Sequence, residues 1–138
     1  MSTYLARTTT SYQVENRPWL LGLEGTQPGQ NPSATLDVSA FTAGTHYPNG
    51  FIPSGTVVSK LANGLWGPFD AAAASGEHGI LFGSCRVPNL ADLTQDVAGA
   101  LVTSFASVDW NRLPAGGRPT LAAARTAMPR VDFASVTP

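Results

Sequence analysis

The side chains with the greatest chemical potential are two histidines and a single cysteine. His46 lies in "GTHYPNG" and His78 in "SGEHGI", and both stretches have the composition of turns. A zinc site would need further ligands, and neither Cys85 nor the acidic residues stand at metal-ligand spacing from the histidines. His78 and Cys85 are the residue types of a base and a nucleophile, but no orienting group or oxyanion hole accompanies them. A lone Cys in a β-like run is typical of a small core residue, so the sequence predicts no metal site here.

Two other patterns also have ordinary structural explanations. Asp92 and Asp96 are four residues apart in the polar stretch "NLADLTQD", which is typical of a solvated turn. The glycines Gly76, Gly79 and Gly83 do not lie between a strand and a helix, so they do not form a phosphate cradle. They are better suited to tight turns and bulges. The sequence therefore predicts a protein that is not an enzyme and that has no catalytic residue and no cofactor.

The composition also bears on the kind of partner. Charged residues make up 12% of the 138 residues, against about 25% in typical soluble domains. The net charge is −1 and the eight cations are scattered, whereas nucleic acid binding needs a basic stripe. No apolar run approaches the roughly 18 residues of a membrane span. We therefore expect no nucleic acid and no membrane partner, and a weakly solvated surface that favours association with other proteins.

Two further features bear on the cellular compartment in which the protein is made. The single cysteine excludes an intrachain disulfide, which suits a reducing environment. The start "MSTYLARTTT" lacks the apolar core of a signal peptide. We expect the protein to be made and assembled in the cytoplasm.

The elements that must position these residues are mostly strands. Asn63-Gly64 follows the β-branched run "TVVSKL" and is the dipeptide of a type I′ hairpin. Ala-rich "PTLAAARTAM" predicts one short helix, with Pro119 in its first turn. The other expected strands are "GILFGSCRV" (79–87), "VAGALVTSFASV" (97–108) and a short final "RVDF". A chain of this length is expected to form a single, mainly β domain with a short C-terminal helix.

The N-terminal third has a different character. Residues 1–45 are rich in Gly, Pro and polar side chains, with one apolar cluster at Trp19, Leu20 and Leu21. Two interpretations are open: a loosely ordered terminus, or an extended arm that becomes ordered on a partner. An exposed cluster of this kind would be unfavourable in a free tail, so it is expected to pack on its own domain or on a neighbour. The resulting division is an arm over residues 1–45 and a β-rich domain over residues 46–138.

One longer stretch resembles a known family. "FIPSGTVVSKLANGLWGPFDAAAASGEHGILF" looks like the central block of the head decoration proteins of tailed bacteriophages, the lambda-type decoration proteins. The most specific feature is the Leu65–Asp70 corner, "LWGPFD". "GALVTSFASVDWNRLPAGG", followed by a short helix and "PRVDF", is similar to the second half of that family. The resemblance covers about residues 45–134.

The resemblance implies both a fold and a function. The fold would be a small domain of the β-clip or β-sandwich-like kind with an extended N-terminal arm. The protein would be a structural component of the virion, assembled in the host cytoplasm. It would bind the capsid exterior as a homotrimer at three-fold and quasi-three-fold positions and stabilise the shell against internal DNA pressure. The arm could add a strand to the major capsid protein, with Trp19, Leu20 and Leu21 as the contact residues.

Two aromatic residues of the corner have two interpretations. Trp66 and Phe69 either fix the corner as core residues or form trimer or capsid contacts, in which large aromatics are enriched. Other functions also stay open. A trimeric dUTPase-like enzyme would need an Arg-Ser-Ser-Gly run, which is absent from the sequence. Another phage structural β module, from a tail, a baseplate or a host-surface-binding domain, is the main alternative.

Overall fold

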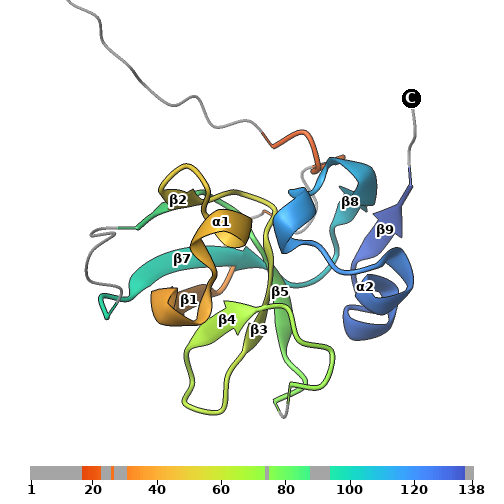
Figure 1. Cartoon of the computed structure of the whole chain (residues 1–138). Coiled ribbons are helices and arrows are strands. Elements are labelled where there is room, and N and C mark those ends of the chain that lie inside the picture. The colour runs from red at the N-terminus through yellow and green to blue at the C-terminus, as the bar shows by residue number, and fades with distance from the viewer. Residues whose placement is uncertain (1–16, 23–25, 27–30, 74, 88–93, 136–138) are drawn as a thin grey trace, which may run out of the picture.

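A closed five-stranded β-barrel is the centre of the fold (Figure 1). The computed structural model describes residues 17–22, 26, 31–73, 75–87 and 94–135. The barrel strands are hydrogen-bonded in the order β1-β4-β3-β5-β7. Their bounds are β1 (Ser33–Leu36), β3 (Val57–Lys60), β4 (Trp66–Pro68), β5 (His78–Leu81) and β7 (Val97–Val102). The expectation of a mainly β single domain with a short C-terminal helix is confirmed.

One parallel contact closes the barrel. All other barrel pairs are antiparallel, but β1 pairs with β4 in parallel through Leu36 and Trp66. The amide of Asp37 continues this contact by donating to the carbonyl of Trp66 at 2.8 Å. The strand β4 therefore pairs with β3 on one side and with β1 on the other, which connects the hairpin to the first strand of the barrel.

The β3–β4 hairpin forms where Asn63-Gly64 predicts it, but its turn has another geometry. A type I′ turn needs positive φ at both central residues, and of these two only Gly64 has it, at φ +86°. The side chain of Asn63 instead accepts a hydrogen bond from the amide of Leu65 at 3.0 Å. The loop is closed by a bond from the amide of Leu61 to the carbonyl of Leu65 at 2.7 Å. The turn is therefore an Asx turn in a longer loop, and the type I′ prediction was wrong.

Two long strands expected from the sequence are each interrupted. Residues 79–87 form β5 and, after a bend, β6 (Cys85–Arg86), which pairs with β2 (Phe51–Ile52) outside the barrel. Residues 97–108 form β7 and β8 (Ser107–Asp109), which pairs in parallel with β9 (Asp132–Ala134). Both segments leave the barrel at these breaks and continue in separate two-stranded sheets.

The C-terminal part covers one side of the barrel. It contains α2 (Leu121–Ala127) and the 3-10 helices η2 (Trp110–Arg112) and η3 (Ala115–Gly117). Thr120 caps α2, with its hydroxyl accepting from the amide of Ala123 at 3.3 Å, so Pro119 precedes the cap instead of occupying the first turn. One apolar core fills the barrel, and a second lies between the barrel and this C-terminal part.

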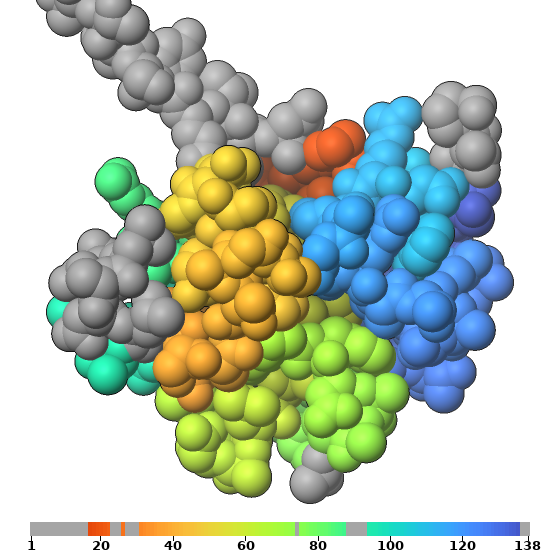
Figure 2. Space-filling model, in the orientation of Figure 1, coloured from red at the N-terminus to blue at the C-terminus, as the bar shows by residue number. Residues whose placement is uncertain are grey.

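Several elements lie wholly or mostly within residues 1–45, the range expected to form an arm. They are β1, the 3-10 helix η1 (Val38–Ala40) and the helix α1 (Ala43–His46). β1 is a barrel strand, and α1 packs against η3, so that the orange and blue segments meet in Figure 2. Residues 31–45 thus belong to the barrel domain. Residues 1–16, 23–25 and 27–30 of the expected arm lie outside the described residues.

Candidate protein interaction site

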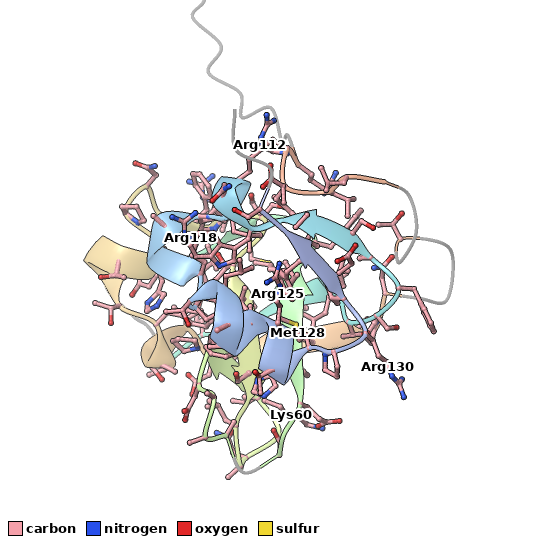
Figure 3. The ribbon with its side chains drawn as sticks, turned by 90° about the vertical axis from the view of Figure 1, so that its right-hand side faces the viewer. Lys60, Arg112, Arg118, Arg125, Met128 and Arg130 are labelled. Carbon is pink, nitrogen blue, oxygen red and sulfur yellow. The ribbon has the colours of Figure 1, made fainter. Side chains whose placement is uncertain are left out.

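A recess of about 480 Å³ opens where the barrel meets the end of α2. Its walls include Pro32 before β1, Trp66 of β4, Thr103 after β7 and residues 127–130. Lys60, Met128 and Arg130 are labelled on this side of the molecule in Figure 3. The recess therefore combines parts of the chain that are far apart in the sequence.

The recess has apolar walls and a charged rim. Trp66, Met128 and Pro129 contribute an aromatic ring, a thioether and a proline ring. At the rim, Lys60 Nζ lies 3.2 Å from Glu77 Oε2 in an exposed ion pair. The lining is therefore mixed, with apolar and polar residues side by side, as at many protein interfaces.

A hydrogen-bonded cluster connects the recess, which His78 lines, to the corner. The Ser59 hydroxyl lies 2.7 Å from His78 Nδ1 and accepts from the amide of Asp70 at 2.9 Å. The ring of Phe69 lies 5.3 Å from that of His78. Burial lowers the pKa of His78, and the nearby Asp70 carboxylate offsets part of this effect. Because Ser59 is 0% exposed, its hydroxyl fastens the corner to β3 and is not presented to a substrate.

The two corner aromatics have separate surroundings. Trp66 is partly buried against the barrel core and also lines the recess. Phe69 is partly buried against the second core and lines a smaller depression of about 160 Å³ beside His46 and residues 116–119. Each ring thus packs on its own domain and keeps an accessible edge, and the structure brings Trp66 but not Phe69 to the recess.

The Trp19–Leu21 cluster packs on its own domain. Trp19 is 1% exposed, and its carbonyl accepts from the amide of Asp109 at 2.7 Å. Leu20 forms an isolated antiparallel bridge with Val108 of β8. Leu21 is 48% exposed. Of these three predicted capsid-contact residues, Leu21 therefore offers the large exposed side chain, whereas Trp19 would have to leave the core to contact a partner.

One exposed residue was missed by the sequence reasoning. Phe105 is 65% exposed and has φ +61°, the one non-glycine residue of the described chain with positive φ. It stands in the strand-like run "VTSFASV", where alternating residues hid the break between β7 and β8. No signal in the sequence marks this reversal.

The remaining residues considered as catalytic or metal-binding candidates are His46, Cys85, Asp92 and Asp96. His46 Nδ1 accepts from the amide of Thr42 at 2.9 Å, and burial lowers its pKa. Cys85 is buried. Asp92 lies outside the described residues, so its relation to Asp96 is not seen. Among the described residues, no three His, Cys, Asp or Glu side chains are grouped so that they could hold a metal ion.

Comparison with protein-family models, with curated proteins and with solved structures finds no match to this chain. Within the described ranges, none of the helices has the length and apolar character needed to cross a membrane. The recess and the exposed side chains of Leu21 and Phe105 are the surface features of the described residues best suited to contact a partner.

Proposed function

We propose that this protein is a capsid decoration protein of a tailed bacteriophage. It binds the outside of the shell as a homotrimer at three-fold and quasi-three-fold positions, with the major capsid protein as its partner. It has no catalytic activity and no cofactor. Its domain is of the β-clip kind, with the barrel described above as its core.

The observation that carries the proposal is the structural role of the Leu65–Asp70 corner. This is the most specific part of the resemblance, and it contains β4, the strand that joins β1 to β3 and closes the barrel. Gly67 packs closely there: a Cβ at this position would lie 3.2 Å from both methyl carbons of Leu61, so any side chain would require Leu61 to shift by a few tenths of an ångström. The same strand carries Trp66 into the wall of the recess. The corner thus links the fold to a surface suited to protein contacts.

The chemistry of the exposed surface supports the same function. Charge is sparse over the whole sequence, and the described chain exposes two large apolar side chains, Leu21 and Phe105. A trimer presents three copies of each contact to the lattice, so the second and third contacts form intramolecularly. Weak individual contacts then gain about 10²–10⁴ in overall affinity. Such contacts would hold neighbouring capsid subunits together, and this function needs no enzymatic turnover.

The experiment is cosedimentation of the purified chain with expanded capsids that lack it. We expect saturable binding at a ratio of one trimer per three-fold or quasi-three-fold position. Binding to tails or baseplates in place of capsids would favour the alternative phage module and contradict the proposal.

A further inference from the structure

Phe105 combines an unfavourable backbone conformation with an unfavourable exposure. A bulky residue with φ near +60° is an outlier, because its Cβ crowds the backbone. Glycine or asparagine would meet the needs of this turn at lower cost. A large aromatic side chain that is 65% exposed also leaves its apolar surface in water. Backbone strain of this kind is concentrated at functional sites.

The turn is held firmly by the residues around it. The amide of Phe105 donates to the carbonyl of Arg130 at 2.9 Å, and the amide of Asp132 donates to the carbonyl of Ala106, also at 2.9 Å. Val102 and Ala106 on either side are both buried in the core between the barrel and the C-terminal part. The backbone therefore fixes the direction of the Phe105 Cα–Cβ bond, and the side chain is presented to the outside.

The recess begins directly beside this turn. Thr103, two residues before Phe105, lines it, and so does Arg130, whose carbonyl holds the Phe105 amide. Phe105 itself is not part of the lining, so its ring does not fill the recess of its own chain. Trp66, which is partly buried and lines the recess, suits an aromatic ring, because aromatic pairs are favourable beyond their buried area.

The charges beside the turn are self-complementary. Arg130 and Asp132 are both exposed, and neither side chain makes an ion pair within the part of the chain that the structure describes. Figure 3 shows the Arg130 side chain extending outward at the edge of the molecule. In a cyclic trimer each contact is head-to-tail, so residues of one surface meet residues of a different surface on the next copy. Arg130 at the recess of one copy and Asp132 beside the turn of the next then match in charge across the contact.

We propose that Phe105 of one copy inserts into the recess of a second copy of this chain, with Arg130 facing Asp132 across the contact. An exposed ring beside an apolar recess gives each copy both halves of the interface. The inference rests on the trimer of the proposed function and names the surface through which its copies meet. It also explains why a strained turn carries a phenylalanine.

The first test is sedimentation velocity over a concentration series, with Phe105→Gly and a matched control, Leu21→Ala. We expect Phe105→Gly to weaken self-association by about tenfold or more, as for a central interface aromatic. Its melting temperature as a monomer should be unchanged or higher, because glycine relieves the positive φ. Leu21→Ala removes a similar exposed apolar side chain that does not line the recess and should leave the association unchanged. Equal self-association of the unchanged protein, the Phe105→Gly variant and the Leu21→Ala variant would overturn the proposal.

Charge reversal is the second test. Arg130→Asp and Asp132→Arg should each weaken association, and the double variant should restore it, because the opposite charges again meet across the contact. Failure of the double variant to recover would contradict the predicted pairing.

A photo-crosslinking amino acid at position 105, used in solution and on capsids, identifies the occupant. Crosslinks to residues 127–130 of a second copy would support the proposal. Capsid binding without such crosslinks would overturn the proposed contact between copies and leave the proposed decoration function intact. Crosslinked oligomers that do not bind capsids would support the contact and contradict the decoration function.

Discussion

The indole nitrogen of Trp19 donates a hydrogen bond of 3.2 Å to the hydroxyl of Ser54 inside the protein. That hydroxyl in turn donates to the carbonyl of Phe82 at 2.7 Å. The indole also packs on Gly55, where a Cβ would lie 2.9 Å from the ring and where φ is +93°. The segment around Trp19 is therefore a part of the folded core, although it lies in the N-terminal stretch whose composition indicates an arm.

Replacing Trp19 by alanine should destabilise the protein strongly. The change removes a buried ring, leaves a cavity and strips the Ser54 hydroxyl of one partner. We expect the free energy of unfolding to fall by about 3–5 kcal/mol. Leu21→Ala is the control, and as a half-exposed position it should change the value by about 0.5 kcal/mol or less. Chemical denaturation measures both, and equal effects would contradict the assignment of Trp19 to the core.

Two N-terminal deletions should separate stability from capsid binding. Removing residues 1–16 leaves Trp19 in place, together with Arg17, whose guanidinium lies 4.0 Å from the ring centre of Phe82. We expect this variant to keep its melting temperature and to lose affinity for capsids if the first residues form the capsid-binding arm. Removing residues 1–22 should lower the melting temperature as well. Unchanged capsid occupancy after the shorter deletion would exclude the arm from binding.

Gly116 should tolerate no side chain. A Cβ there would collide with the backbone carbonyl of Thr45, because η3 and α1 approach closely at this point. We expect Gly116→Ala to lower the free energy of unfolding by about 1–3 kcal/mol, as overpacking does. Gly44→Ala is the matched control in α1, with nothing within 4 Å of the added carbon. A thermal melt that ranks the two variants in the opposite order would contradict the predicted contact.

Stability should depend on pH through two histidines. Burial holds the pKa values of His46 and His78 below their ordinary value of 6.5. The unfolded chain therefore binds more protons than the folded chain as the pH falls below 6.5. The free energy of unfolding should be highest above that pH and decrease until the lowered pKa values are passed.

The measurement is the melting temperature between about pH 8 and about pH 5. Asparagine at both positions keeps an acceptor near Nδ1 but cannot titrate, so the double variant should have a flatter profile. An unchanged slope in that variant would assign the pH dependence to other groups.

The sequence predicts the local elements better than their arrangement. Alternation and β-branched residues identify the β3–β4 hairpin, and the alanine run identifies α2, because these signals depend on neighbouring residues. Barrel closure depends on a parallel contact between Leu36 and Trp66, which are far apart in the chain and carry no local signal.

The residues of the candidate site could likewise be predicted only where a local sequence signal marks them. Trp66 is marked as important by the corner in which it lies, although the sequence leaves its role open. Phe105 is hidden, because the run "VTSFASV" has no Gly, Pro or Asn to mark the break between β7 and β8. The recess combines residues from both ends of the chain, and only the fold brings them together.

Cryo-electron microscopy of the phage particles that carry the gene, with and without the protein, tests the central claim most directly. The account predicts trimeric density on the outer surface at three-fold and quasi-three-fold positions, which is absent from particles without the protein. Those particles should also lose DNA at lower temperature. Density in the tail, or an unchanged capsid surface in particles that contain the protein, would contradict the assignment.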